Sequence, residues 1–183
     1  MERTSHAVVT GASSGIGRAV VTTLLERGWR VTGLCRTAST EKVDGLTIVP
    51  VDIMDFERLR AVRDALVHSA GFMRTVSLGE LSMDDATAMW RLHVEAAMLL
   101  ADTLAPRMPA GRIVLIGSRT ANGAATRSQY AATKSALTGL APRGITVNVV
   151  TPGEVAALTA FLLGEHAGAI TGQQIVMCGG ASL

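Results

Sequence analysis

The sequence predicts a doubly wound α/β domain, in which a parallel sheet lies between two layers of helices. Its apolar runs are short and rich in β-branched residues, and segments with helical spacing separate them. Strand and helix patterns alternate without a hairpin between strands, which favours a parallel sheet covered on both faces. With 183 residues and 48% hydrophobic content, the chain can bury the core of one domain, spanning residues 1–183.

Seven short apolar runs are expected to form the strands, and they cover residues 6–10, 30–35, 46–51, 65–68, 112–117, 144–150 and 174–177. Helical patterns cover residues 18–27, about 55–64, 82–105, 130 to about 140, and about 154–164. In the first helix Ala19, Val20 and Leu24 repeat at helical spacing, and Gly28 ends the pattern. Ligands of such sheets bind beyond the carboxyl ends of the strands, so the residues that follow each strand are the candidates for binding.

Charge and cysteine content exclude several classes of partner. Seventeen basic residues against fifteen acidic ones give a net charge of +2, which leaves no surplus for a surface that binds nucleic acid. Cys35 and Cys178 lack the spacing of metal ligands, so we expect no metal site and a reducing, cytoplasmic location. The start of the sequence does not resemble a signal peptide, and no apolar run is long enough for a membrane span.

The segment from Thr10 to Gly17 predicts a phosphate cradle, because it joins the first strand to the first helix. Glycines let the backbone turn sharply and approach a pyrophosphate, while the helix N–H groups and dipole face the anion. This is the placement of a dinucleotide-binding loop in a Rossmann-type fold. The candidate cofactor-binding residues of the loop are Gly11, Ser13, Ser14, Gly15, Ile16 and Gly17. The alternative is a glycine-rich turn that binds nothing.

Arg36, directly after the second strand, predicts the choice of cofactor. An acidic residue there holds the ribose hydroxyls of NAD(H), whereas an arginine accommodates the 2′-phosphate of NADP(H). No carboxylate ends this strand, and Arg36 can form a bidentate contact with a phosphate. We therefore expect NADP(H) rather than NAD(H). The alternative is a solvated surface arginine.

Tyr130 and Lys134 lie one helical turn apart, which puts a phenol and an ammonium group on the same face. A nearby positive charge favours phenolate and lowers the pKa of the phenol, which would make Tyr130 an acid/base. Ser118 follows the strand at 112–117, so its hydroxyl is expected at the carboxyl edge of the sheet. The alternative is a solvent-facing tyrosine on an ordinary helix.

Together these motifs resemble the short-chain dehydrogenase/reductase family, and in particular its 3-oxoacyl-ACP reductase-like members. Further matches are Asp52, the segment 66–71 in place of the usual Leu-Val-Asn-Asn-Ala-Gly, and the segment 147–153. The resemblance implies hydride transfer between a nicotinamide and a small carbonyl or alcohol substrate. It implies that Tyr130 exchanges the proton, that Lys134 holds the nicotinamide ribose, and that Ser118 orients the substrate oxygen.

The resemblance also extends the cofactor-binding set. Asp52 would meet the adenine, and the remaining members of the set are Ile53, His68, Ala70, Gly71, Tyr130, Lys134, Pro152 and Gly153. Family members usually form dimers or tetramers, so we expect a homodimer or homotetramer.

The chain departs from the family pattern at several points. His93 replaces a helix asparagine that organises a proton relay, so it is either a substitute catalytic group or a tolerated polar residue. His68 and Ser69 replace the Asn-Asn pair. Three stretches have no counterpart here, including the substrate-covering segment that normally follows Gly153. Either segments of the natural chain are absent from this sequence, or the protein is a deletion variant that closes poorly over its substrate.

Three functions fit these observations. The first is an NADP-dependent oxidoreductase that acts on a small carbonyl or alcohol. The second is a catalytically idle NADP-binding sensor or regulator, for which His93 and the missing segment leave room. An epimerase or dehydratase would reuse the same tyrosine and lysine, but the chain length and the Thr171-Gly172 motif do not favour it.

Overall fold

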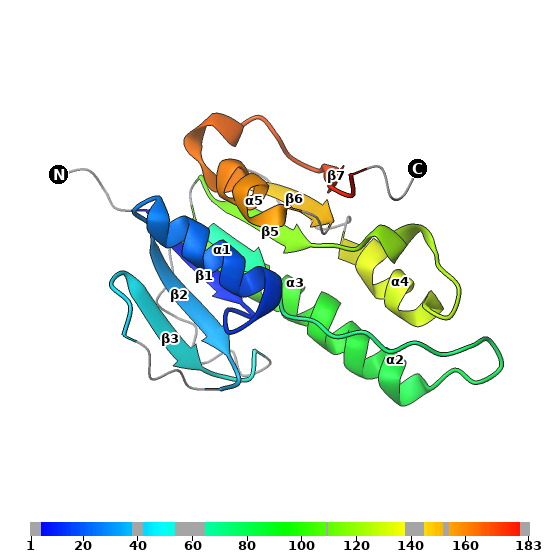
Figure 1. The fold of residues 1–183 in the computed structure, drawn as a ribbon. Helices are drawn as coiled ribbons and strands as arrows, with labels where there is room; N and C mark the ends of the chain where they lie inside the picture. Colours follow the sequence, from blue (N-terminus) through cyan, green and yellow to red (C-terminus); the bar gives the residue numbers. More distant parts are fainter. Residues whose placement is uncertain are drawn as a thin grey trace.

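A computed structural model of the chain describes residues 5–37, 42–53, 65–108, 110–137, 145–151 and 154–179. In these ranges seven parallel strands form one sheet with the order β3-β2-β1-β4-β5-β6-β7 (Figure 1). The strands are β1 (His6–Thr10), β2 (Arg30–Cys35), β3 (Leu46–Pro50), β4 (Ala65–His68), β5 (Arg112–Ile116), β6 (Thr146–Thr151) and β7 (Gln174–Val176). The strand order reverses between β1 and β4. This is the predicted Rossmann-type fold.

Helices cover both faces of the sheet (Figure 1). The helices α1 (Gly15–Glu26) and α5 (Val155–Leu163) pack side by side on one face. On the other face lies α3 (Ala96–Leu104), and α2 (Met83–Trp90) precedes it along the same line and packs against α4 (Ser128–Ala136). The α4 helix carries the Tyr130-Lys134 pair.

Two hydrophobic cores, one on each face, hold these layers together. Leu66 of β4 packs with Leu100 of α3 on one face. Val9 of β1 packs with Leu24 of α1 and Leu162 of α5 on the other. Because the sheet is buried on both faces, its central strands are continuously apolar, which is why the sequence shows runs rather than alternation.

The predicted helix at 82–105 is interrupted by a π-turn. Between α2 and α3 the segment Arg91–Glu95 is π-helical, and the N–H of Ala96 bonds to the carbonyl of Arg91, five residues back. At the start of α2 the Ser82 hydroxyl caps the helix by accepting a hydrogen bond from the Asp85 N–H at 3.2 Å. Helical periodicity predicts this helix, but it does not reveal the extra residue in the middle.

The strand predictions are confirmed to within two residues at each end, the largest difference being at the start of β6. The helix predicted at about 55–64 lies outside the described residues, as do 138–144, where the helix with Tyr130 was expected to end. Between β6 and α5 the chain has only three residues, 152–154. No helix in the described ranges is both long and apolar enough to span a membrane.

Candidate active site

The loop between β1 and α1 brings the backbone close to the end of β4. Gly11 has a φ of +67°, and a Cβ there would lie 3.1 Å from the Ala70 backbone. A Cβ at Gly17 would overlap the carbonyl oxygen of Gly11, so both positions require glycine. The first turn of α1 holds no acidic side chain, and its N-cap residue Ser14 makes no side-chain capping bond. Its N–H groups can therefore meet an anion such as a pyrophosphate.

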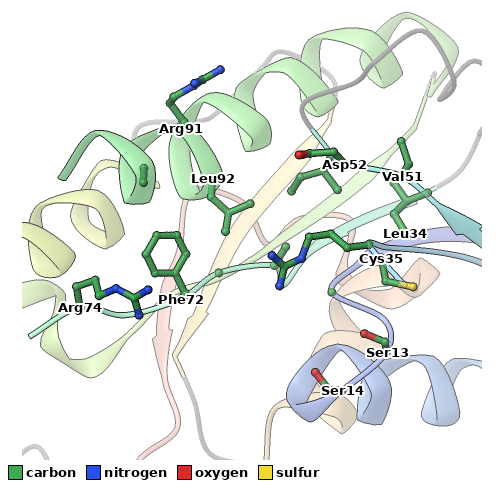
Figure 2. Close-up of a pocket in the computed structure, with 16 residues that line it drawn as sticks. Ser13, Ser14, Leu34, Cys35, Val51, Asp52, Phe72, Arg74, Arg91 and Leu92 are labelled. Atoms are coloured by element: carbon green, nitrogen blue, oxygen red, sulfur yellow. The ribbon is translucent and has the colours of Figure 1, made fainter. Parts of the chain in front are cut away.

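A cleft of about 630 Å³ opens beside this loop, and its volume is in the range of cofactor sites. Figure 2 shows Ser13 and Ser14 on one side of it, and Phe72 and Leu92 across from them. Among the residues assigned to the cofactor from sequence, those that line the cleft are Gly11, Ser13, Ser14, Arg36, Asp52, Ile53, Ala70 and Gly71. The lining residues that the sequence analysis missed are Leu34, Cys35, Val51, Phe72, Arg74, Ala88, Arg91 and Leu92.

The other candidates for cofactor binding lie elsewhere. Gly15 and Gly17 belong to the start of α1, and Ile16 packs against the core under that helix. The His68 side chain is buried in the interior rather than in the cleft wall, with an exposed fraction of 1%. Pro152 and Gly153 lie outside the described residues.

The charged side chains of the cleft are mostly arginines, and two of them are ion-paired, Arg74 with Asp85 at 3.7 Å and Arg91 with Glu95 at 3.8 Å. Arg36, Arg74 and Arg91 line the cleft together with one carboxylate, that of Asp52. The guanidinium of Arg74 lies 5.1 Å from the centre of the Phe72 ring. Arg36 directly follows β2, the position next to an adenine ribose in Rossmann-type folds. An anionic ligand is therefore favoured here.

Ser118, Tyr130 and Lys134 come together at the carboxyl end of β5. The Lys134 ammonium lies 5.9 Å from the centre of the Tyr130 ring and donates a hydrogen bond to the carbonyl of Ile116 at 2.8 Å. The Ser118 side chain is close enough to Tyr130 to favour its phenolate, and its hydroxyl lies 2.9 Å from the Thr120 hydroxyl. It also accepts a hydrogen bond from the Thr120 N–H at 3.2 Å, which caps the short 3₁₀ turn Arg119–Asn122. A strand end and one helix face thus bring the three side chains together.

The pKa values in this group differ from the expectation. Burial raises the pKa of Tyr130, while the Ser118 side chain and the charge of Arg127 oppose that rise. Burial also lowers the pKa of Lys134 to about 8. The prediction that Lys134 lowers the pKa of Tyr130 is therefore wrong. Desolvation disfavours the phenolate more strongly than the neighbouring groups favour it. The phenol stays protonated at neutral pH, which is the form that donates a proton.

His93, in the π-turn, is fully buried against the same group. Its Nε2 accepts a hydrogen bond from the Phe72 N–H at 3.1 Å, so the ring proton is on Nδ1, 2.8 Å from the Thr133 hydroxyl. The Thr133 hydroxyl donates in turn to the Tyr130 carbonyl at 2.8 Å. Because both ring nitrogens are engaged, this geometry favours a role in holding elements together over a proton relay.

The sequence analysis did not predict two hydroxyl groups that lie near the site, those of Thr10 and Thr133. Thr133 follows Tyr130 by three residues, a spacing at which a helical threonine hydroxyl can reach a backbone carbonyl of the preceding turn. That spacing was a usable signal. Thr10 gave no such signal in the sequence beyond its place before Gly11. No group of three potential metal ligands occurs among the described residues.

Comparison with known proteins identifies the family. The model of the family described as short chain dehydrogenase matches residues 5–164. The chain belongs to the short-chain dehydrogenase family. In this short-chain dehydrogenase, the matched range includes the glycine loop and the segment with Ser118, Tyr130 and Lys134.

The relatives of this short-chain dehydrogenase include enzymes and a binding protein. It is 30% identical to a 3-oxoacyl-[acyl-carrier-protein] reductase of Salmonella typhimurium over 233 residues, covering 95% of this chain and 96% of that protein. It is 34% identical to a cyclic-di-GMP-binding biofilm dispersal mediator protein of Escherichia coli, covering 81% and 72%. A short-chain dehydrogenase/reductase from Serratia marcescens BCRC 10948 has a similar structure, with a TM-score of 0.88, 31% identity and 98% coverage of both chains.

The alignments also bear on the length of this short-chain dehydrogenase. The match to the reductase runs over 233 residues, whereas the whole chain has 183. The relative therefore has segments without a counterpart here. In this chain three residues separate β6 from α5.

Proposed function

We propose that this chain transfers a hydride between a nicotinamide dinucleotide and a small carbonyl or alcohol, with Tyr130 as the proton donor or acceptor. The observation that carries the proposal is that Ser118, Tyr130 and Lys134 gather beside an arginine-lined cleft with a phosphate cradle. Gly71 joins the two parts, because it lines the cleft and a Cβ there would lie 3.6 Å from Lys134 Nζ. Carbonyl reduction needs both parts side by side.

The nicotinamide, when bound, supplies the hydride to the carbonyl carbon. The Ser118 hydroxyl then donates a hydrogen bond to the carbonyl oxygen, and the Tyr130 phenol transfers its proton to that oxygen. The raised pKa of Tyr130 suits this reductive direction, since the phenol is protonated before the reaction. The charge of Arg127 and the Ser118 side chain favour the phenolate that forms. The Lys134 ammonium, held in place by the Ile116 carbonyl, would bind the nicotinamide ribose.

Oxidation of NADPH with a panel of small ketones tests this proposal. Tyr130→Phe keeps the ring and its packing but removes the acid, so we expect turnover to fall by about 10²-fold or more while NADPH binding persists. The matched control is Ser135→Ala, on the same helix as Tyr130, which removes an exposed hydroxyl that donates to the Ala121 carbonyl. Equal turnover in wild type and Tyr130→Phe would refute the role of the tyrosine.

We also propose that the cofactor is NADP(H), bound through Arg36. The support is the position of Arg36 at the cleft and the absence of a carboxylate directly after β2. The residues present fit the dinucleotide, since only glycine fits the cradle at Gly11 and Gly17. Asp52 and Ile53 also line the cleft and would meet the adenine.

Titration with NADPH and NADH in parallel tests the cofactor assignment. Arg36→Ala is expected to weaken NADPH binding by roughly 10- to 100-fold, because a charge-assisted hydrogen bond is lost, and to leave NADH unchanged. Arg91→Ala is the control for the loss of one positive charge at the cleft, because Arg91 also lines it but pairs with Glu95 at 3.8 Å. Tighter binding of NADH that is insensitive to Arg36→Ala would overturn the assignment.

A second candidate is a catalytically idle nucleotide-binding regulator. The observation that favours it is the 34% identity to a protein described as cyclic-di-GMP-binding. A protein that binds NADPH or a cyclic dinucleotide but oxidises NADPH with no ketone of the panel would support this candidate over the reductase.

We further propose that residues 1–183 act as one domain and assemble as a homodimer or homotetramer. The support for assembly is apolar surface along the α2–α3 line, where Trp90, Met98 and Leu99 are all exposed. Light scattering of the purified chain measures the assembly directly, and a monomer at micromolar concentration would contradict it.

A further inference from the structure

The π-turn between α2 and α3 is bonded to the end of β4 by a histidine that the reaction does not use. A π-turn departs from the regular α-helical bonding pattern and often marks a functional site. In this turn the Leu92 carbonyl accepts a hydrogen bond from His68 Nε2 at 3.1 Å. His68 is the last residue of β4, at the point where the strand order reverses.

The hydrogen bonds around Thr10 determine where the His68 proton lies. The Thr10 hydroxyl accepts hydrogen bonds from the N–H groups of Ser69 and Ala70, both at 3.0 Å, which uses its two lone pairs. Its single proton is then donated to His68 Nδ1, 3.1 Å away. His68 Nδ1 is therefore unprotonated, and the ring proton is on Nε2, where it bonds to Leu92.

His93, the next residue after Leu92, has the opposite tautomer. The Phe72 N–H occupies its Nε2, and its Nδ1 donates to Thr133 on α4. Two sets of hydrogen bonds, joined by the backbone between Leu92 and His93, thus connect the β1 end of the phosphate cradle to the helix with Tyr130. The His93 ring also meets the Tyr130 ring edge to face, with 5.5 Å between centres.

We propose that His68 is a positioning residue, which acts with His93 as one unit to hold Tyr130 in register with the phosphate cradle. The His68 bond to Leu92 fixes the π-turn, and the π-turn orients the His93 ring against Phe72 and Thr133. By the resemblance described from the sequence, both histidines stand where the family usually has asparagine. An asparagine at position 68 is too short to bond to both Thr10 and Leu92. The longer His68 reaches both, and through Leu92 it supports the neighbouring His93. The expected effect of His68 on turnover rests on the proposed function, whereas the tautomers of the two histidines do not depend on it.

Two substitutions at His68 separate its two hydrogen bonds. His68→Gln places an amide N–H near the position of Nε2 and keeps the bond to Leu92. His68→Asn places its amide oxygen near the position of Nδ1, so it keeps the bond from Thr10 and loses the bond to Leu92. We expect His68→Asn to lower kcat by about 10- to 100-fold with little change in the KM for NADPH, because Tyr130 is misplaced. We expect His68→Gln to retain most of the turnover.

NMR of the imidazole nitrogens reads the tautomers without any catalysis. In the wild type we expect His68 with its proton on Nε2 and His93 with its proton on Nδ1. In His68→Asn we expect His93 to become a mixture of tautomers. In His68→Gln we expect His93 to keep its proton on Nδ1.

Several results would overturn the inference. One is a His68 proton on Nδ1 in the wild type, which needs no variant. Another is a His93 signal unchanged in His68→Asn. A third is equal loss of kcat and of melting temperature in both variants, because that pattern indicates a general contribution to stability. If the wild type oxidises no NADPH, the proposed function fails while the tautomers still decide the inference.

Discussion

Two buried neutral histidines should make the fold sensitive to mild acid. Burial, together with the nearby charge of Lys134, lowers the pKa of both His68 and His93 from 6.5 to about 3. In the unfolded chain both regain an ordinary pKa. Between about pH 6.5 and pH 3 the unfolded chain therefore binds protons that the folded chain does not, so stability falls as the pH falls through this window.

The size of this effect follows from the two shifts. One pKa unit corresponds to about 1.4 kcal/mol. At about pH 5 each histidine then contributes about 2 kcal/mol of destabilisation relative to neutral pH, and the pair roughly 4 kcal/mol. That is a large part of the free energy of unfolding of a typical folded protein, which is about 5–15 kcal/mol, or about 0.1 kcal/mol per residue. Lys134, with a pKa of about 8, stays charged across this window and does not add to the loss.

Urea unfolding at about pH 7.5 and pH 5, extrapolated to zero denaturant, measures the difference in the free energy of unfolding. His68→Gln is the matched variant, because it cannot titrate and keeps the donor to Leu92. It should lose about half as much stability between the two pH values as the wild type does. The reasoning is refuted if the wild type loses less than about 1 kcal/mol, or if His68→Gln loses as much as the wild type.

The remaining predictions concern the cradle and the lysine. Gly17→Ala forces a Cβ into the Gly11 carbonyl oxygen, so calorimetric titration should find NADPH binding abolished; unchanged binding would contradict the close approach. Because the Lys134 pKa is lowered to about 8, kcat/KM for ketone reduction should fall above about pH 8 as the ammonium deprotonates. Lys134→Arg, which stays charged, should move that fall to higher pH, and a profile identical to that of the wild type would exclude Lys134 as the titrating group.

Much of the fold was readable from the sequence because its signals are local. The run from His6 to Thr10 is apolar and β-branched, and a glycine turn and a periodic helix follow it directly. Strand positions therefore came within two residues of the structure. The spacing of Tyr130 and Lys134 predicted one helix face for the same reason, since four residues make about one turn.

The two histidines show what the sequence by itself left open. It determined that His68 and His93 are unusual, but their roles depend on which groups face each ring nitrogen. Those groups come from Thr10, Leu92, Phe72 and Thr133, which are far from them in the chain or hidden inside a helix. A side chain that can donate or accept at either nitrogen takes its tautomer from such partners, so only the folded structure decides it.

The same reason applies to the tyrosine. From sequence, Lys134 is a charge near Tyr130 and should lower its pKa. In the structure the phenol is partly buried, and this desolvation raises its pKa, while the ammonium of Lys134 is bonded to the Ile116 carbonyl. The sequence determined which groups are present and which lie on one helix face. Their burial, and hence the protonation of the proposed acid, was decided by the packing of β5, α4 and the π-turn, because desolvation depends on the whole surrounding structure.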